Sequence, residues 1–416
     1  MAPGTPEQKV THVCIGSALL PVGKLQFTQR SRRHHSEFQY FESWMNDARA
    51  FAIAPQLPLG LTPSYVSKAS SGDQRDSLPS VLQDATPDAW GRLLMARVHG
   101  ADLSEFDMLT LLDDATRQGA LRFTGGDGGI ISGHRTPVPN LNQLDALRDI
   151  AVRVEQRREV SSEDLRLIAG ASGSIGGARP KINVQDRDAL WIAKFSSSRD
   201  QSPVERIEVA TLQLARECGL RAPDARLVLE NSDHPVALIR RFDRRAGMRV
   251  PYFSARTALN RSVAEQGSYT EIAEAIRMIS KAARADLHEL WARMAFNVLV
   301  TNTDDHLKNH GFIYADNGLW RLSPLFDVNP QAGRHRYLET AIIEGGPFKA
   351  SLDLAVAAAE FFDLSKHEAR KRARAMASVI ANRWKPLMRQ FGVGGEDLKS
   401  LADAFEHSEA EKALSL

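Results

Sequence analysis

A carboxylate, an amide and a second carboxylate stand at a spacing that suits phosphoryl transfer. Asp304 precedes Asn309 by five residues, and Asp327 follows Asp304 by 23 residues. Enzymes that transfer a nucleotide phosphoryl group can place one Asp at the attacking hydroxyl and an Asn five residues later at a metal ion. A later Asp then bridges Mg²⁺ to the phosphates. The spacing predicts Asp304, Asn309 and Asp327 as catalytic residues, the last two as metal ligands, with ATP and Mg²⁺ as cofactors.

The segment between Asn309 and Asp327 predicts the element that would bring these residues together. Residues 311–314 and 319–322 read as two strands, and Asp316-Asn317-Gly318 between them is a turn signal. Such a hairpin would fold Asp327 back beside Asn309. The alternative is three unrelated polar loop residues in solvent, but the hairpin and the second Asp favour one shared site.

A helix ahead of Asp304 is expected to hold the Asp304 loop rigid. Asp286-Leu287-His288-Glu289 resembles an N-cap followed by an acidic residue at the third helical position. The apolar residues that follow share one helical face, which we expect to be core: Leu287, Leu290, Trp291, Met294, Ala295 and Val298.

A glycine-dense segment, residues 170–181, precedes another predicted strand. Glycines permit close backbone approach and positive φ, so successive N–H groups could point at phosphate. The candidate contacts are Gly173, Ser174, Gly176, Gly177 and Lys181. The segment is not a Walker A loop and does not match G-x-G-x-x-G in full, so a flexible linker is the alternative.

A strand lysine and a helical glutamate follow the glycine-dense segment. Lys194 lies in the predicted strand 191–195, and Glu208 lies 14 residues later in the predicted helix 203–218. A strand lysine on the phosphates, held by a helical glutamate, is the arrangement of protein kinases. Glu205 competes for the second role, and a solvated helix residue is the plainer interpretation of Glu208.

Four more residues are candidates for nucleotide contact. The predicted strand 236–242 ends in Arg241 and Phe242, and we expect its backbone to join two lobes and to meet adenine; an edge strand with charged ends is the alternative. His306 could orient Asp304, meet phosphate or form only a structural hydrogen bond. Lys308 could contact the γ-phosphate or face water.

Composition limits the class of protein. The 416 residues are 43% hydrophobic and 25% charged, which is ordinary for a globular protein of two or three structural units. A formal net charge of +2 does not by itself indicate a nucleic-acid or membrane partner. Cys14 and Cys218 form no disulfide framework, and we see neither a signal peptide nor a membrane-spanning apolar run. We therefore expect a cytoplasmic protein.

With these residues in order, the chain resembles the HipA family of serine/threonine kinases, which are the toxins of type II toxin–antitoxin pairs. The similarity rests on four motifs: residues 174–181, 241–244, 303–309 and 324–327. Residues 82–92 and 119–123 also look like the family's N-terminal part, so the resemblance covers nearly the whole chain. The ordered set of motifs is specific, although each motif alone is not.

The resemblance implies an α+β, protein-kinase-like fold of two lobes with an extra N-terminal α/β subdomain. We expect a HipA-like N-terminal subdomain at residues 1–125. A kinase N-lobe-like region that holds the glycine-rich segment would follow at 126–245, and an all-helical C-terminal catalytic lobe at 246–416. Residues 246–280 match no pattern and are expected to shape substrate choice.

The resemblance also implies roles for single residues. Asp304 would be the catalytic base, Asn309 and Asp327 the Mg²⁺ ligands, and Lys194 the residue that holds the ATP phosphates. Ser174 would be autophosphorylated, with Ser172 as the alternative. A phosphate adds about −1.5 to −2 charges, so in a loop that cradles ATP phosphates it should lower activity.

The partners follow from the same resemblance. The family phosphorylates an aminoacyl-tRNA synthetase, notably the glutamyl enzyme, and is neutralised by a small helix-turn-helix antitoxin of the HipB type. The chain would then reach operator DNA through its antitoxin. The basic helix predicted after the capping box at Ser365 could also touch DNA phosphates, but a solvated face is the alternative. Two other functions stay open: a small-molecule kinase on the same scaffold, or a nucleotide-binding co-repressor.

Overall fold

The computed structural model describes residues 7–30, 33–68, 73–133, 137–232, 234–333 and 336–416. Contacts between Cα atoms divide the chain into two compact units. The first unit consists of Met1–Ala193, Asp243–Glu265 and Asp316–Gly318; the second consists of Lys194–Phe242, Gln266–Ala315 and Leu319–Leu416. Each unit is described by itself.

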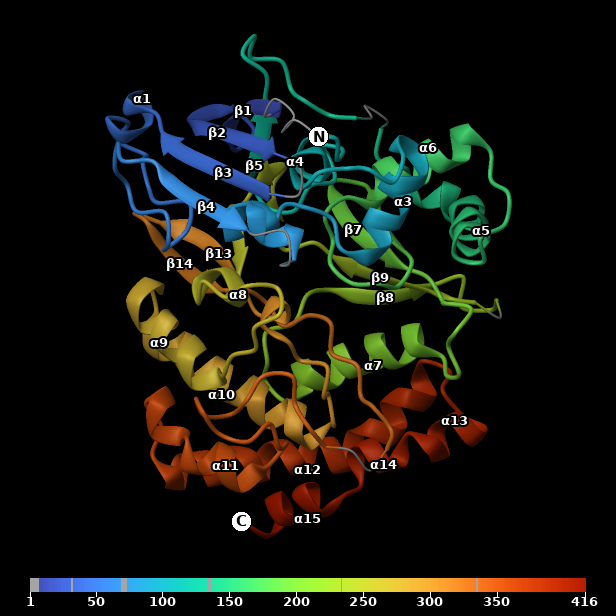
Figure 1. Cartoon of the computed structure of the whole chain (residues 1–416). Coiled ribbons are helices and arrows are strands. Elements are labelled where there is room, and N and C mark those ends of the chain that lie inside the picture. Colours follow the sequence, from blue (N-terminus) through green and yellow to red (C-terminus); the bar gives the residue numbers. More distant parts are fainter. Residues whose placement is uncertain (1–6, 31–32, 69–72, 134–136, 233, 334–335) are drawn as a thin grey trace. The chain divides into compact units, whose positions relative to one another are not determined.

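The first unit contains an antiparallel sheet of five strands in the order β4-β3-β2-β1-β5 (Figure 1). The strands are β1 (Glu7–Ile15), β2 (Leu20–Arg30), β3 (Arg33–Tyr40), β4 (Ser64–Lys68) and β5 (Leu121–Thr124). In β3 every second residue is buried, as expected for a sheet with one face in the core. Leu25 is paired with Phe38, Val13 is paired with Phe123, and all four side chains are almost fully buried.

Short helices and small strands complete the first unit. The helices are α1 (Glu42–Met45), η1 (Gln74–Ser77), α2 (Ser80–Gln83), α3 (Ala89–His99), α4 (Glu105–Thr110), η2 (Leu141–Gln143), α5 (Leu144–Glu155), α6 (Ser162–Ser172) and α8 (Ala255–Ala258). The remaining strands are β6 (Lys181–Asp186), β7 (Ala189–Lys194), β10 (Arg244–Arg245), β11 (Met248–Arg249) and β12 (Tyr252–Ser254).

Buried polar groups join distant segments of the first unit. Asp84 accepts hydrogen bonds from the backbone N–H and the hydroxyl of Ser254 at 2.7 and 2.9 Å, and from the Thr257 hydroxyl at 2.7 Å. The Arg117 guanidinium is fully buried and donates to the carbonyls of Ala85, Leu109 and Leu112. The Asp84 bonds connect residues 254–257 to the first unit, to which Asp243–Glu265 belongs, whereas the boundary predicted from the sequence placed residues from 246 onward in the C-terminal lobe.

The second unit is mostly helical. Its helices are α7 (Val204–Glu217), α9 (Tyr269–Ile279), α10 (Ala283–Leu299), η3 (Leu307–Asn309), α11 (Leu352–Ala357), η4 (Ala359–Phe362), α12 (Lys366–Gln390), α13 (Gly395–Ser400), α14 (Ala402–Phe405) and α15 (Ser408–Ser415). Its strands are β8 (Ala225–Val228), β9 (Val236–Arg240), β13 (Gly311–Asp316) and β14 (Leu319–Leu322). The predicted hairpin at residues 311–322 is therefore confirmed. The description of residues 246–416 as all-helical is wrong, because β11, β12, β13 and β14 lie within this range.

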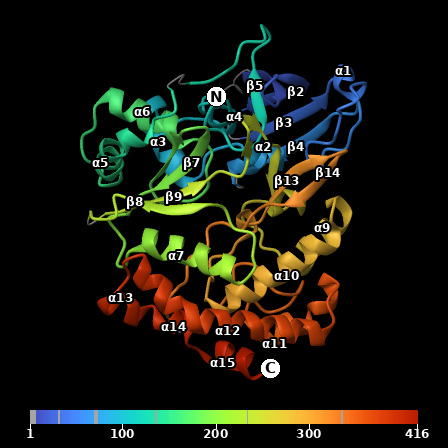
Figure 2. The same cartoon turned by 180° about the vertical axis from the view of Figure 1, so that it is seen from behind.

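Helices α10 and α12 form the core of the second unit. The predicted apolar face of α10 is buried, and Trp291 donates from Nε1 to the Ala355 carbonyl at 2.9 Å. The predicted capping box at Ser365 and Glu368 begins α12. Helix α12 packs against α7, α10 and α15 (Figures 1 and 2). Within the described residues, no helix combines the length and apolar character needed to cross a membrane.

Asp286 is not the N-cap that the sequence predicted. Helix α10 begins at Ala283, so Asp286 lies inside its first turn. Its fully buried carboxylate accepts from the Arg321 guanidinium at 2.8 and 2.9 Å and from the Ser280 hydroxyl at 2.7 Å. The Leu322 N–H donates to it at 3.1 Å and Arg221 at 2.9 Å. Asp286 therefore attaches the hairpin to α10, and a contact across 35 residues takes the place of a local cap.

Replacing Asp286 should test this attachment. We expect Asp286→Asn to lower the free energy of unfolding by about 3 kcal/mol, because it leaves the two guanidinium groups without a carboxylate in a buried network. Urea denaturation followed by circular dichroism would measure the change. As a control, Asp363→Asn removes an exposed pair with Arg277 and should cost less than about 1 kcal/mol. Equal effects of the two substitutions would contradict the proposed role of Asp286.

Candidate active site

Lys194 is held between two carboxylates in the second unit. Its Nζ atom donates to Glu208 Oε1 at 2.6 Å and to Asp327 Oδ1 at 2.7 Å. Lys194 is the last residue of β7, and Glu208 lies on the buried face of α7. Glu205, the competing candidate, instead accepts from the Ser196 hydroxyl at 3.0 Å. The structure thus brings together the lysine and glutamate that the sequence paired, and adds Asp327 to them.

The charges of this triad are mutually dependent. Burial disfavours a charged ammonium, but the carboxylates of Asp327 and Glu208 outweigh that effect and raise the pKa of Lys194. The ammonium therefore stays charged at neutral pH. Two of its three N–H groups are used by the carboxylates, so one remains for an anionic ligand.

The loop that carries Asp304 starts from a tightly closed helix end. After α10, Thr301 adopts a positive φ of 53°, and the Asn302 N–H donates to the Asn297 carbonyl at 2.9 Å. This is a Schellman-type closure, and it usually places glycine where Thr301 stands. The Thr301 hydroxyl donates to the Ala404 carbonyl at 2.8 Å and accepts from Arg336 at 2.7 Å. Tertiary contacts thus hold a β-branched residue in a conformation that it rarely adopts alone.

The two neighbouring aspartates of the loop have different environments. Asp305 is 1% exposed and accepts from His310 Nε2 at 2.8 Å and from the Tyr269 hydroxyl. Burial alone would raise the pKa of Asp305, but His310 and Tyr269 lower it. The Asp304 side chain reaches solvent. Asp304 is therefore the member of the pair that can meet a substrate, and Asp305 anchors the loop.

The environment of Asp304 suits a proton acceptor. Partial desolvation raises its pKa, His306 opposes this, and the negative charges of Asp327, Glu339 and Asp305 add to the increase. A carboxylate with a raised pKa binds a proton more readily than an ordinary aspartate, which is what a general base needs.

Asn309 is oriented by the loop itself. Its Nδ2 atom donates to the Asp304 carbonyl at 3.0 Å, which leaves Oδ1 as the atom able to bind a metal ion. His306 is exposed and Lys308 is partly exposed on the same loop. Among the described residues, the His306 side chain makes no hydrogen bond to the Asp304 carboxylate. The predicted nucleotide contacts of His306 and Lys308 stay predictions.

Three asparagines that the sequence analysis missed support this site. Asn302 Nδ2 donates to Asn297 Oδ1 at 3.1 Å, and the Asn329 N–H donates to Asn302 Oδ1 at 3.2 Å. This chain of bonds connects α10 to the segment that carries Asp327. Asn302 stands two residues before Asp304 and Asn329 two residues after Asp327, but proximity in sequence is a weak signal without the fold.

The oxygen atoms near Asp327 fit Mg²⁺. Asp327 has a positive φ of 57°, and its carboxylate lies 3.4 Å from Asn329 Nδ2. Asn329 Oδ1 is buried and has no hydrogen-bond partner among the described residues. Magnesium prefers carboxylate and amide oxygens, so the Asp327 carboxylate and Asn309 Oδ1 are suitable donors, whereas the Asn329 amide turns its nitrogen toward Asp327.

Phe242 packs against the segment that carries Asp327. Its ring packs on Phe326, with 5.5 Å between the ring centroids, directly before Asp327. Arg241 is buried beside it in the sequence. Strand β9 ends at Arg240, so the predicted strand at 236–242 extends two residues too far. The expected adenine contact of this segment stays a prediction.

The glycine-dense segment lies in the first unit and is largely self-contained. Gly170, Ala171 and Ser172 form the last turn of α6, so the predicted loop starts only at Gly173. Gly173 has a positive φ of 65°, and an added Cβ would lie 2.6 Å from the Thr116 carbonyl. The Gly177 N–H donates to Asp88 Oδ2 at 3.1 Å, and the Lys181 ammonium donates to the Gly176 carbonyl. The Gly177 N–H and the Lys181 ammonium are thus bonded within their own unit, and the predicted phosphate contacts of the segment stay predictions.

The two candidate serines are both buried. The Ser174 hydroxyl accepts from the Gln118 N–H at 2.7 Å, outside any helix. The Ser172 hydroxyl donates to the Ala169 carbonyl at 3.1 Å, inside α6. A phosphate could reach Ser172 only if the end of α6 unwound, whereas Ser174 requires release of a short irregular segment.

Two family models match the chain. The model described as the HipA N-terminal domain matches residues 13–124, and the model described as the HipA-like C-terminal domain matches residues 173–384. Among solved structures, a chain from the toxin–antitoxin complex of HipA, HipB and operator DNA of Shewanella oneidensis MR-1 is similar at a TM-score of 0.69 and 16% identity. The match covers 97% of this chain and 96% of that chain. This likeness confirms the α+β fold class predicted from the sequence.

Two curated relatives match smaller shares of the chain. The Sinorhizobium fredii protein described as "Putative kinase Y4dM" is 30% identical over 161 residues, which is 35% of this chain and 39% of that protein. "Putative kinase Y4mE" of the same organism is 24% identical over 334 residues, which is 73% of this chain and 74% of that protein. The first of these matches therefore spans well under half of the relative's length.

The different roles of Asp304 and Asp305 can be tested by stability. We expect Asp305→Ala to lower the free energy of unfolding by about 3 kcal/mol at neutral pH, because Tyr269 and His310 lose their buried acceptor. Asp304→Ala should change it by less than about 0.5 kcal/mol. Because folding lowers the pKa of Asp305, its contribution is present above the ordinary aspartate pKa and is lost in more acidic solution. Urea denaturation at several pH values would show the difference, and a larger effect of Asp304→Ala would refute it.

Proposed function

Because the chain belongs to the HipA family, we propose that it is an ATP- and Mg²⁺-dependent protein serine/threonine kinase that acts as the toxin of a toxin–antitoxin pair. The observation that carries this proposal is the position of Lys194 between Glu208 and Asp327. A pure nucleotide-binding protein has no need of an oriented base, and Asp304 is exposed on a loop anchored by Asp305 and Asn309.

Each residue of the second unit has a distinct part in the proposed reaction. Lys194 holds phosphate oxygens with its remaining N–H, and Glu208 keeps its ammonium in place. Asn309 and Asp327 would hold Mg²⁺, which supplies positive charge to the phosphates when it is bound. Asp304 accepts the proton of the substrate hydroxyl, and its raised pKa suits that task.

We propose that Ser174 is the site of self-inactivation. Its hydroxyl is buried against the Gln118 N–H, so a phosphate of about −1.5 to −2 charges could not return to that position. The modified segment would stay outside, and any contact that it makes with nucleotide would be lost. Ser172 is the weaker candidate because its hydroxyl is bonded inside α6.

The proposed partners follow the family and its structural neighbour. The neighbour was solved with HipB and operator DNA, which supports a helix-turn-helix antitoxin as the direct partner and DNA as the indirect one. The favoured substrate is an aminoacyl-tRNA synthetase of the glutamyl type. The basic residues of α12, including Arg370, Lys371 and Arg374, are exposed, and a solvated face explains them without DNA.

Phosphopeptide mapping tests the kinase proposal. We expect the purified protein to transfer phosphate from ATP to Ser174 in the presence of Mg²⁺, and to glutamyl-tRNA synthetase in a panel of synthetases. Asp304→Asn should lower the rate by at least about 100-fold, because it removes the proton acceptor. Asp188→Asn, in the exposed turn between β6 and β7, is the matched control and should keep full activity.

Two further results, one with purified protein and one in cells, would favour the alternatives. Phosphate transfer to a metabolite without any modified serine would indicate a small-molecule kinase. Growth arrest that persists in cells expressing Asp304→Asn would indicate a co-repressor that only binds nucleotide. Either result would refute the protein-kinase proposal.

The pH dependence of the reaction should report the environment of Asp304. Only the deprotonated carboxylate can accept a proton, so kcat/KM falls as the pH falls through its pKa. Because the pKa of Asp304 is raised, the acid limb should lie above the ordinary aspartate value of about 3.9. A rate profile between pH 4 and 8, with acid stability checked by circular dichroism, would measure it. A limb at or below the ordinary value would contradict Asp304 as the base.

A further inference from the structure

Tyr269 is a fully buried residue that has no part in the proposed chemistry. It is the first residue of α9, and its hydroxyl connects two other elements of the second unit. The hydroxyl donates to the Asp305 carboxylate, on the loop that follows α10, and accepts from Asn297 Nδ2, on α10 itself, at 3.0 Å. The hydrogen and one acceptor site of this hydroxyl are therefore both used.

The bond from Asn297 continues to the segment that carries Asp327. Asn297 Oδ1 accepts from Asn302 Nδ2 at 3.1 Å, and Asn302 Oδ1 accepts from the Asn329 N–H at 3.2 Å. Each amide side chain donates with its nitrogen and accepts with its oxygen, so all the bonds run in one direction and end at the Asp305 carboxylate. Bonds aligned in this way polarise one another. We call these five residues the Tyr269 network: Asp305, Tyr269, Asn297, Asn302 and Asn329.

The side chains of the Tyr269 network are shielded from water. Tyr269, Asn297, Asn302 and Asp305 are each at most 1% exposed. Water cannot readily replace a bond that is lost there, so the network favours a single arrangement of its members. His310 Nε2 donates to the same Asp305 oxygen as the Tyr269 hydroxyl, at 2.8 Å, and so holds the end of the network in place.

Other bonds hold the neighbouring segments without the Tyr269 hydroxyl. The Gln331 N–H donates to the Thr301 carbonyl at 3.0 Å, and the Thr340 hydroxyl donates to the Asp305 carbonyl at 2.6 Å. Removal of the hydroxyl should therefore leave the fold in place. What it removes is the connection between the side chains of the two segments.

We propose that Tyr269 is a positioning residue, which fixes Asp304 and Asp327 relative to each other through the Tyr269 network. One end of the network, Asp305, directly follows Asp304. The other end, Asn329, lies beside Asp327, with 3.4 Å between Asn329 Nδ2 and Asp327 Oδ1. The network thus joins the loop of the proposed base to the segment of a proposed metal ligand.

This inference rests on the proposed kinase function. Transfer requires the substrate hydroxyl, which Asp304 would hold, to stand at a fixed position relative to the phosphates that Asp327 would help to hold. A misplacement of about 1 Å can cost about 100-fold in rate. A network that couples the two carboxylates therefore acts on the rate of transfer more than on nucleotide binding.

Tyr269→Phe in the full-length protein tests the proposal, because it keeps the ring and removes only the hydroxyl. We expect the initial rate of phosphate transfer from ATP to protein, at saturating ATP and Mg²⁺, to fall by at least about tenfold. The ATP concentration that gives half the maximal rate should change by less than about twofold, because Lys194 lies outside the network. An unchanged maximal rate would overturn the proposal.

A second substitution tests whether the residues act as one network. Asn302→Ala interrupts the same connection at another point. The variant that carries both Tyr269→Phe and Asn302→Ala should therefore be about as slow as the slower single variant. Effects that multiply would show that the two residues act separately, and they would overturn the network.

Hydrogen exchange gives a result that does not need catalysis. Tyr269→Phe should speed amide exchange in two separate peptides, residues 300–310 and 325–331, measured by mass spectrometry without nucleotide. Faster exchange in the first peptide alone would indicate a local anchor and would overturn the proposal. If the wild type transfers no phosphate, the proposed kinase function fails, and the exchange of the two peptides by itself decides whether Tyr269 couples them.

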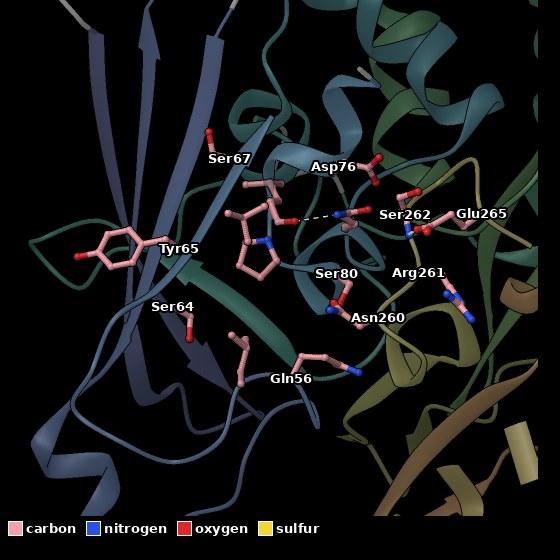
Figure 3. Close-up of a pocket in the computed structure, with 15 residues that line it drawn as sticks. Gln56, Ser64, Tyr65, Ser67, Asp76, Ser80, Asn260, Arg261, Ser262 and Glu265 are labelled. Carbon is pink, nitrogen blue, oxygen red and sulfur yellow. Dashed lines mark hydrogen bonds between the residues drawn. The ribbon is translucent and has the colours of Figure 1, made fainter. Parts of the chain in front are cut away.

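Two tyrosines of the first unit are matched controls. The buried Tyr40 hydroxyl donates to the Leu57 carbonyl at 2.7 Å and accepts from the Ile53 N–H at 3.0 Å, so Tyr40→Phe removes a comparable pair of bonds. Tyr65 is 70% exposed, and Figure 3 shows its ring directed away from the other labelled residues. Tyr40→Phe and Tyr65→Phe should both keep the wild-type rate, with folding checked by thermal denaturation. Equal slowing by Tyr40→Phe and Tyr269→Phe would indicate a general loss of stability and would overturn the proposal.

Discussion

The buried ammonium of Lys194 is the interaction on which the second unit depends. A charge removed from water is tolerated only when opposite charges surround it, and here Glu208 and Asp327 do so from 14 and 133 residues away. Helix α7 must therefore present Glu208 toward the end of β7. The segment after β14 must also return Asp327 to the same point. Much of the structure around Lys194 serves to position the Glu208 and Asp327 carboxylates.

Several bonds place Asp327 without touching Lys194. Asp286 attaches β14 to α10, and the Leu325 N–H donates to the Arg221 carbonyl at 2.6 Å. The Phe242 ring packs on Phe326, and Asn329 is tied to Asn302. Positive φ values at Thr301 and Asp327 fall at the two ends of this arrangement. At these two residues the surrounding bonds can sustain the strained backbone that positions the site.

In the first unit, buried polar groups also hold segments together that are distant in sequence. Buried Arg117 donates to the carbonyls of Ala85 and Leu109, and buried Asp84 accepts from Ser254 and Thr257, which are 170 and 173 residues away. In its glycine-dense segment, the Gly177 N–H donates to Asp88 and the Lys181 ammonium donates to the Gly176 carbonyl. The oxygens of Gln56 and Gln83 are the contrast, because they are buried without donors among the described residues.

The sequence by itself determined the elements whose signals are local. The spacing of Asp304, Asn309 and Asp327, the hairpin at 311–322, the apolar face of α10 and the cap at Ser365 are each readable within a few turns of chain, and the motif order identified the family. The five-residue spacing to Asn309 already favoured Asp304 over Asp305. Only the tertiary structure shows the different environments of the two side chains, because the burial of Asp305 depends on Tyr269 and His310. It also turned Asp286 from an expected cap into a buried anchor, and it showed Gly170 to Ser172 as helix. These outcomes depend on partners that are distant in sequence. Local propensity and periodicity do not tell which distant side chain will neutralise a buried charge.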